Sequence, residues 1–176
     1  GYILADGRQA ISLEELAMES YYSLSNSSVL TAEASRQVKK NTVATGCCFA
    51  EVEVDMKLGK IKVLDIVNVH DSGVLLNPQL AAMQVHGGMS MGMGCGLSEQ
   101  LLLDKKTGRP LNGTLLDYKL MTTMDTPDLT AEFVELNDPM GPYGNKALGE
   151  PPAIPGAPAI RNAVLHATGI GFAEIP

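Results

Sequence analysis

The sequence of this chain predicts an α+β fold with a mixed sheet and packed helices. Residues 50–56 alternate between apolar and acidic side chains, which is the pattern of a half-buried strand. Residues 77–102 open with Asn77-Pro78 and continue as a long apolar segment, which is typical of a helix. The predicted strands and helices follow one another without a regular strand–helix–strand alternation, and this order favours the α+β class.

The first predicted helix covers residues 12–24. Ser12 and Glu15 have the spacing of a capping box, in which each side chain accepts a hydrogen bond from the backbone N–H of the other residue. Apolar residues then follow at helical spacing: Leu13, Leu16, Ala17 and Leu24. The serine-rich residues 25–28 end this helix, and the polar residues 29–45 are expected to form a loop.

A β-hairpin is predicted next. Its first strand places an apolar row on one side and the acidic residues Glu51, Glu53 and Asp55 on a solvated side. A turn at residues 57–60 leads to a second strand over residues 61–69, which are rich in β-branched side chains. The apolar row consists of Ala50, Val52, Val54 and Met56.

Beyond the long helix, residues 104–108 have the composition of a turn. Residues 112–120 are expected to be extended, and residues 129–136 to form a strand. The last predicted helix covers residues 158–168 and ends at Gly169. Its inward-facing residues are Ala159, Ile160, Ala163, Val164 and Ala167.

Composition bounds the class of protein. The 176 residues suffice for one domain with a hydrophobic core. A formal net charge of −7 argues against a nucleic-acid partner, because no basic stripe is available to neutralise phosphates. No apolar run reaches the length of a membrane span. Three cysteines, two of them adjacent, form neither a disulfide framework nor a zinc motif, so a reducing, cytoplasmic location is expected.

The Gly/Pro-rich loop 141–152 carries the candidate catalytic residue Glu150. Gly149 before it allows close backbone approach, and the two prolines after it fix φ and remove two backbone donors. A carboxylate on so stiff a loop suits a site in which one base is held beside a large cofactor. The alternative is a surface turn whose glutamate is only solvated, and the spacing alone leaves both interpretations open.

A stripe of small residues follows the long helix. Gln84, Gly88, Gly92 and Gly96 recur at four-residue steps. Each interior glycine costs about 1 kcal/mol relative to alanine, so the stripe requires a compensating contact. That contact is either a flat ligand, for which the Gln84 amide would suit a polar heterocycle, or the close packing of another helix, which chemistry alone favours. A dinucleotide-binding fingerprint does not fit, because its glycines must follow a strand and open a helix.

The histidines do not predict a metal site. His70, Asp71 and His86 could be imagined as ligands, but no pair of histidines has the spacing of helical metal ligands. No residue is therefore assigned to a metal. His70 and Asp71 are instead expected to form hydrogen bonds at the chain reversal before Asn77.

The order of these motifs resembles the C-terminal part of the molybdenum-binding subunit of the xanthine dehydrogenase and aldehyde oxidase family. The most diagnostic match is Gly-Glu-Pro-Pro at residues 149–152. The other matching segments, in family order, are residues 50–55, 69–73 with 77–78, 84–88 with 91–94, 116–119 and 141–144. The resemblance covers about residues 44–172. It implies that residues 1–176 are the C-terminal part of one molybdopterin-binding domain, truncated at both ends and most similar to the purine-oxidising branch.

The resemblance also implies a role for each candidate site residue. Glu150 matches the catalytic base, which acts on a molybdenum-bound hydroxyl while a purine or related N-heterocycle such as xanthine or hypoxanthine is oxidised, with water as the oxygen source. Gln84 matches a residue that hydrogen-bonds the pterin, and Gly149 matches one whose backbone lies beside the cofactor. Gly88, on the glycine stripe, is likewise expected to bind the cofactor.

Further cofactors and partners are implied elsewhere in the complete enzyme. Iron–sulfur clusters, FAD and NAD would lie in other domains or subunits, and the remainder of the molybdenum subunit would be a partner. The family's other cofactor loops lie upstream of this chain, so the isolated chain is expected to hold no cofactor and to be inactive. An alternative from another class is a non-catalytic assembly or binding module that contacts a partner through the Gly- and Met-rich helix.

Overall fold

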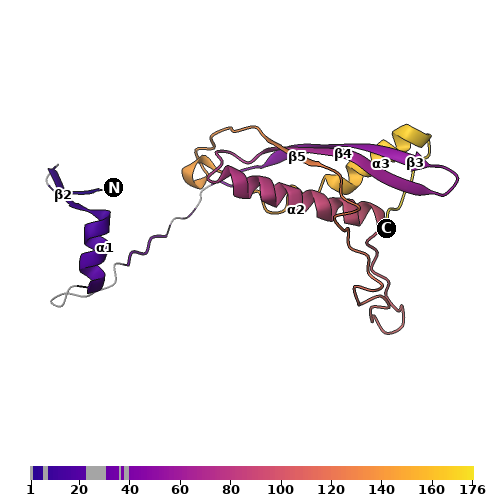
Figure 1. The fold of residues 1–176 in the computed structure, drawn as a ribbon, viewed down its shortest axis with the longest axis horizontal. Coiled ribbons are helices and arrows are strands. Elements are labelled where there is room, and N and C mark those ends of the chain that lie inside the picture. The colour runs from indigo at the N-terminus through magenta and orange to yellow at the C-terminus, as the bar shows by residue number, and fades with distance from the viewer. Residues whose placement is uncertain (1, 6–7, 23–30, 36, 38–39) are drawn as a thin grey trace. The chain divides into compact units, whose positions relative to one another are not determined.

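The computed structural model describes residues 2–5, 8–22, 31–35, 37 and 40–176 (Figure 1). The chain divides into two units, Gly1–Gln37 and Val38–Pro176, which are described separately. Within the described residues, no helix combines the length and the apolar character that crossing a membrane requires.

The first unit contains a short hairpin and one helix. Strands β1 (Tyr2–Ala5) and β2 (Arg8–Ser12) pair antiparallel, and α1 covers Leu13–Tyr22. The predicted capping box is confirmed: the Ser12 N–H donates to the Glu15 carboxylate at 2.9 Å, and the Glu15 N–H donates to Ser12 Oγ at 3.0 Å. The predicted end of this helix and the first part of the following loop lie outside the described residues.

The second unit is built on a mixed three-stranded sheet of order β3–β4–β5, which confirms the predicted α+β class. Strand β3 (Thr45–Asp55) pairs antiparallel with β4 (Lys60–Asp71), and β5 (Leu129–Phe133) pairs parallel with β4. The predicted hairpin is thus confirmed. In its turn the Asp55 carboxylate accepts hydrogen bonds from the N–H groups of Lys57 and Leu58 at 2.9 and 3.0 Å.

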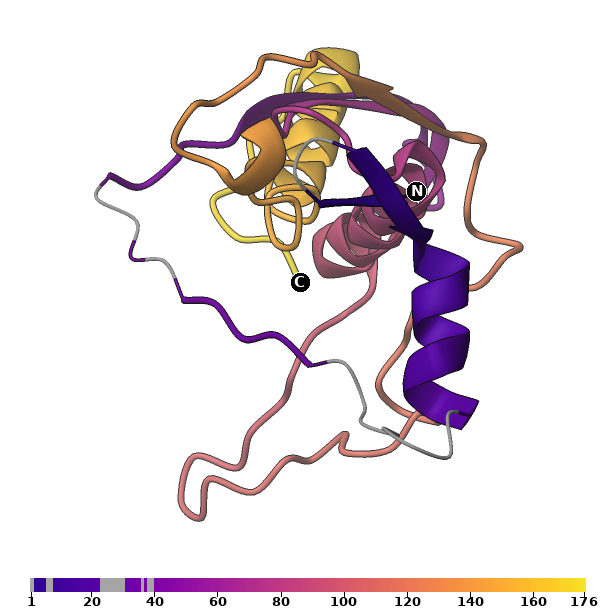
Figure 2. The ribbon, with the colours of Figure 1, turned by 90° about the vertical axis from the view of Figure 1, so that its left-hand side faces the viewer.

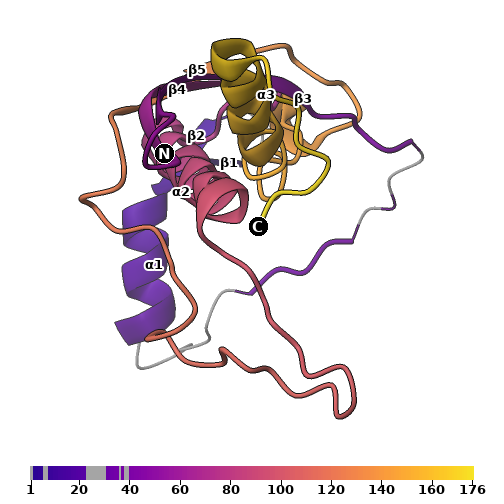
Figure 3. The same ribbon diagram turned by 90° about the vertical axis from the view of Figure 1, so that its right-hand side faces the viewer.

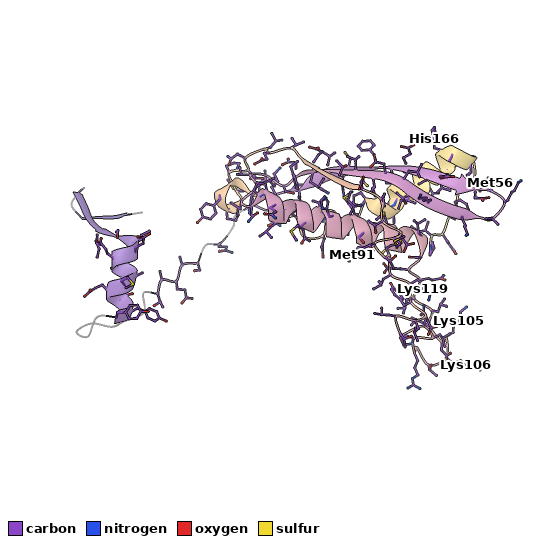
Figure 4. The ribbon with its side chains drawn as sticks, in the orientation of Figure 1. Met56, Met91, Lys105, Lys106, Lys119 and His166 are labelled. Atoms are coloured by element: carbon purple, nitrogen blue, oxygen red, sulfur yellow. The ribbon has the colours of Figure 1, made fainter. Side chains whose placement is uncertain are left out.

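The predicted face of the first strand is correct except at its end. Ala50, Val52 and Val54 are half-buried, while Glu51 and Glu53 are exposed. Met56 was expected in the apolar row, but the strand ends one residue earlier. Its side chain is 62% exposed at the tip of the hairpin (Figure 4).

Two helices complete the unit. Helix α2 covers Pro78–Leu97, and Asn77 caps it as predicted, since its Oδ1 accepts a 3.0 Å hydrogen bond from the Leu80 N–H. The helix ends at Leu97 rather than near residue 102, because the N–H groups of Ser98 and Glu99 both donate to the Gly94 carbonyl. Helix α3 covers Gly156–Thr168 and ends, as predicted, at Gly169, whose φ is 73°.

Both helices pack on one face of the sheet (Figures 1 and 3). The core that joins them combines residues of β4, α2 and α3: Val63, Ile66, Val85, Met89, Met93, Ile160 and Val164. Ile160 and Val164 are therefore inward as predicted, and Ala159 and Ala163 are half-buried. Ala167 was expected to face inward but is exposed in the last turn of α3.

The segment between α2 and β5 extends away from the sheet and helices (Figures 2 and 3). The predicted turn at residues 104–108 is present, with the Gly108 N–H donating to the Asp104 carbonyl at 2.8 Å. The expected extended structure at residues 112–120 is wrong: the Thr114 carbonyl accepts from the N–H groups of Asp117 and Tyr118, which closes a turn. Strand β5 begins at Leu129 as predicted but ends at Phe133 rather than at residue 136.

Candidate functional site

The Gly/Pro-rich loop is attached by its backbone to the end of β4. After a short 3-10 turn, η1 (Pro142–Gly144), the Gly144 carbonyl accepts a 2.9 Å hydrogen bond from the Val74 N–H. Gly73 forms a bridge with Asn145, and the Lys146 N–H donates to the Ser72 carbonyl at 2.7 Å. The loop therefore leaves the end of β4 in a fixed direction.

An ion pair reinforces this attachment. Lys146 Nζ lies 2.6 Å from Asp71 Oδ2, and the two side chains are only 11% and 12% exposed. The hydrogen bond from Lys146, followed by one from the Gly73 N–H, holds the pKa of Asp71 below its ordinary value. The prediction that Asp71 forms hydrogen bonds at the chain reversal is thus confirmed, since its Oδ1 accepts from Gly73 at 3.0 Å.

The turn that carries Glu150 is held at both ends by side-chain amides. Gln84 Nε2, on α2, donates a 2.9 Å hydrogen bond to the Gly149 carbonyl. Asn68 Nδ2, on β4, donates a 2.9 Å hydrogen bond to the Pro152 carbonyl. Directly after Pro152, the Ala153 N–H donates to the Glu150 carbonyl at 3.0 Å and closes the turn. The Glu150 side chain is exposed on this restrained turn.

A hollow of about 590 Å³ lies between α2 and this turn. It brings together all four residues that the sequence singled out, Gln84 and Gly88 from α2 and Gly149 and Glu150 from the loop. Glu150 is the only acidic residue among those that line it. The remaining lining residues are Met83, Gly87, Met91, Ala153 and Ile154.

The glycine stripe is explained largely by packing within the chain. A Cβ at Gly88 would lie 2.5 Å from the Pro152 Cβ, and one at Gly92 would lie 3.0 Å from the Gly156 Cα. A Cβ at Gly96 would lie 3.2 Å from the Ala157 Cα. The expectation of close helix packing is therefore confirmed for Gly92 and Gly96, which face α3, whereas Gly88 packs against Pro152 of the loop. The cofactor contact expected of Gly88 stays a prediction, but Pro152 accounts for its missing side chain.

Two glycines of the hollow have no such explanation. A Cβ at Gly87 or at Gly149 would meet no atom within 4 Å, and neither residue has a positive φ. Gly87 nevertheless lies inside a helix, where glycine is about 1 kcal/mol less favourable than alanine. Bare backbone at these two positions fits a flat group that lies against both walls of the hollow.

The chemistry of the lining fits an organic cofactor better than a directly bound ion. Within residues 2–5, 8–22, 31–35, 37 and 40–176, no three His, Cys, Asp or Glu residues are grouped closely enough to hold a metal ion. The polar side chains of the lining are one carboxylate and one amide, Glu150 and Gln84, and these suit an organic ligand. The Gln84 amide can both donate to and accept from such a ligand.

Three polar residues of β4 and the following turn are buried, and two of them, Asn68 and Ser72, were not identified from the sequence. Asn68, His70 and Ser72 alternate along one face, and each is at most 3% exposed. Among the described residues, His70 Nδ1 and Nε2 have no hydrogen-bond partner, so the expected role of His70 at the chain reversal is wrong. Burial instead lowers the pKa of His70. The recurrence of polar residues at positions 68, 70 and 72 was the available signal.

Comparison with known proteins identifies the family. Residues 2–127 match the molybdopterin cofactor-binding domain family. The xanthine dehydrogenase molybdenum-binding subunit of Escherichia coli O157:H7 is 49% identical over 94% of this chain. The chain spans 22% of that protein's length, so it corresponds to about a fifth of this relative.

Solved structures agree with this match. The aldehyde oxidoreductase of Desulfovibrio gigas superimposes with a TM-score of 0.67 and 33% identity over 76% of this chain and 14% of that one. Quinoline 2-oxidoreductase of Pseudomonas putida 86 superimposes with a TM-score of 0.63 and 31% identity over 69% of this chain and 16% of that one. The resemblance read from the motif order is thus confirmed, and the chain belongs to the molybdopterin cofactor-binding domain family of molybdenum-dependent oxidoreductases.

Proposed function

We propose that this chain is part of a molybdenum hydroxylase that oxidises a purine or related N-heterocycle such as xanthine or hypoxanthine, with Glu150 as the catalytic base. The observation that carries the proposal is the hollow between α2 and the loop. It joins a single carboxylate, the Gln84 amide and two glycines whose bare backbone this chain's own packing does not require.

The net reaction converts a ring C–H and water into C–OH, two protons and two electrons. When bound, a molybdenum–pterin group supplies the oxidising centre and the oxygen atom that is transferred. Glu150 accepts the proton of the attacking hydroxyl on a carboxylate oxygen, which is the role of a positioned general base. Its turn is held at Gly149 and Pro152, so the carboxylate starts from a restricted set of positions.

Gln84 and Gly149 would both bind the cofactor. One N–H of the Gln84 amide is engaged by the Gly149 carbonyl, which orients the amide plane. Its other N–H and its Oε1 remain suited to the donors and acceptors of a pterin ring. Gly87 and Gly149 would allow the ring to approach the backbone, and Gly88 would support this wall through its contact with Pro152.

The substrate class is supported by the relatives. The relative with 49% identity is named for xanthine, and one structural relative is named for quinoline, which is another nitrogen heterocycle. The other structural relative is named for aldehydes, which makes aldehydes the first competing substrates to test.

The complete enzyme would require further polypeptide and further cofactors. On α2, Leu80, Met83 and Met91 are each at least 60% exposed, and Met83 and Met91 also line the hollow. This apolar surface suits the remainder of a molybdenum subunit. Iron–sulfur and flavin groups that pass electrons to NAD would belong to other domains or subunits. The chain by itself would hold no cofactor and have no turnover.

The three free cysteines suit a cytoplasmic location. Burial, and to a lesser extent the neighbouring Cys47, raises the pKa of Cys48 to about 11.

The same apolar surface favours a second candidate, a non-catalytic assembly module that uses its Gly- and Met-rich helix to bind a partner. The two functions differ in their dependence on Glu150, which is polar, exposed and unnecessary for apolar docking.

The test uses a complete subunit that contains this chain, co-expressed with its iron–sulfur and flavin partners. Molybdenum and pterin are quantified, and xanthine, hypoxanthine, nicotinate and benzaldehyde are compared as substrates by kcat/KM. We expect stoichiometric molybdenum and the highest kcat/KM with a purine. A complex without molybdenum or oxidation of any substrate would support the assembly module instead, and a preference for benzaldehyde would overturn the substrate class alone.

A further inference from the structure

Asn68 lies beneath the loop that carries Glu150 and is joined to it by one buried hydrogen bond. The residue is in the central strand β4, and its side chain is completely buried. Its Nδ2 donates to the Pro152 carbonyl at 2.9 Å, across 84 positions of sequence. The bond therefore ties the centre of the sheet to the end of the Glu150 turn.

Burial of the Asn68 amide is unfavourable unless its hydrogen bond to Pro152 compensates for the lost contact with water. Among the described residues, Asn68 Oδ1 has no hydrogen-bond partner. A buried polar atom without a partner costs about 1–3 kcal/mol. The preceding inward residue of β4, Ile66, is apolar and also completely buried, so an aliphatic side chain would suit this face. The hydrogen bond to Pro152 is the interaction that offsets this cost.

The turn has few other ways to be held at this end. Pro151 and Pro152 have no N–H groups, so their backbone can form hydrogen bonds only through the carbonyls. Pro152 is itself fully buried, and its carbonyl therefore requires a donor from inside the protein. Gln84 restrains the other end of the turn at Gly149.

We propose that Asn68 is a positioning residue for Glu150: by holding the Pro152 carbonyl, it fixes the orientation of the turn and hence of the carboxylate. The proposal rests on the proposed function of Glu150. The proposal assigns Asn68 no contact with substrate or cofactor. Replacing Asn68 should therefore change the orientation of Glu150 and not the amount of cofactor that the hollow binds.

The first experiment compares Asn68→Leu with Ser72→Ala in the complete, cofactor-loaded enzyme. Leucine has a similar volume but no donor, and Ser72 is buried on the same face with no hydrogen-bond partner for its hydroxyl among the described residues. We expect Asn68→Leu to lower kcat by roughly tenfold or more, since small displacements of a catalytic group are costly. KM and molybdenum content should stay within about twofold, and Ser72→Ala should resemble the parent enzyme.

A second measurement does not depend on turnover. Hydrogen exchange of the Ala153 amide, which donates within the turn, should be faster by roughly tenfold in Asn68→Leu than in Ser72→Ala. Unchanged exchange and unchanged kcat in Asn68→Leu would overturn the positioning role. Equal losses of kcat in both variants, or a loss of molybdenum that parallels kcat, would also overturn it in favour of a general structural role.

A third variant covers the case in which Asn68→Leu does not fold. In Asn68→Asp the protonated carboxyl can donate to Pro152 but the ionised one cannot, and burial raises the pKa of the introduced carboxyl. The ratio of variant to parent kcat should therefore rise as pH falls. A ratio independent of pH would overturn the proposal. Full turnover in Glu150→Gln would overturn both proposals, whereas full turnover in Asn68→Leu alone overturns only this one.

Discussion

Gln84 on α2 and Gly149 on the Gly/Pro-rich loop are joined by a 2.9 Å hydrogen bond from the glutamine amide to the glycine carbonyl. The bond spans 65 positions of sequence and connects the two walls of the hollow. It fixes the amide plane of Gln84 and one end of the Glu150 turn at once. A change at Gln84 therefore affects both the predicted cofactor contact and the loop.

Replacing Gln84 by alanine should reduce cofactor retention. The variant loses the amide contact with the proposed ligand and the bond to Gly149, each worth about 1 kcal/mol net. Molybdenum and pterin content of the purified complete enzyme is the measurement. Gln79→Ala, at an exposed position of the same helix outside the hollow, is the matched control. Equal cofactor content in both variants would remove Gln84 from the site.

Gly87 and Gly88 offer adjacent substitutions with opposite expected effects on stability. Gly88→Ala places a Cβ 2.5 Å from that of Pro152, and such overpacking costs about 1–3 kcal/mol. Gly87→Ala meets no atom within 4 Å and gains helix propensity of up to about 1 kcal/mol. Thermal unfolding should therefore show a lower Tm for Gly88→Ala and an equal or higher one for Gly87→Ala.

The same pair tests the bare backbone at Gly87. If a flat cofactor lies against it, Gly87→Ala should lower molybdenum content even though its Tm does not fall. Normal molybdenum content in a stable Gly87→Ala enzyme would contradict the proposed approach of the ligand to this wall.

His70 should make stability depend on pH. Burial lowers its pKa in the folded state below the ordinary 6.5. The stability gained by keeping His70 neutral is therefore fully present above pH 6.5 and is lost as pH falls towards the folded-state pKa. Over this range the free energy of unfolding changes by at most about 1.4 kcal/mol per pH unit. Its cross-strand neighbours, Gly46 on β3 and Phe133 on β5, do not titrate. Urea unfolding at several pH values should show that the free energy of unfolding of His70→Gln depends less on pH than that of the parent protein. An identical pH dependence in both proteins would contradict the lowered pKa of His70.

The sequence predicted those parts of the fold that depend on local chemistry. The Ser12–Glu15 capping box, the Asn77 cap and the Gly169 stop are short-range arrangements of donors and acceptors, and each is present. The end of α2 was missed because the N–H groups of Ser98 and Glu99 close its last turn on the Gly94 carbonyl, and no glycine or proline follows in residues 98–102 to mark a stop.

The structure brings the predicted site residues together, but the residues that support them were not predicted. Motif order singled out Gln84, Gly149 and Glu150, and the fold brings them to one hollow. Asn68 was missed because it bonds to a carbonyl 84 positions away, which no local pattern reveals. The Asp71–Lys146 ion pair was missed for the same reason, since only the return of the loop to the end of β4 brings its partners together.

The most direct test of the account is Glu150→Gln in the complete, cofactor-loaded enzyme. Glutamine keeps the shape of the side chain but cannot accept the proton, so kcat should fall by about 100- to 10,000-fold. Molybdenum and pterin content should stay near that of the parent, because Gln84 and the backbone of Gly149 are unchanged. A Glu150→Gln enzyme that retains its molybdenum and turns over a purine at a rate comparable to the parent would contradict the central claim.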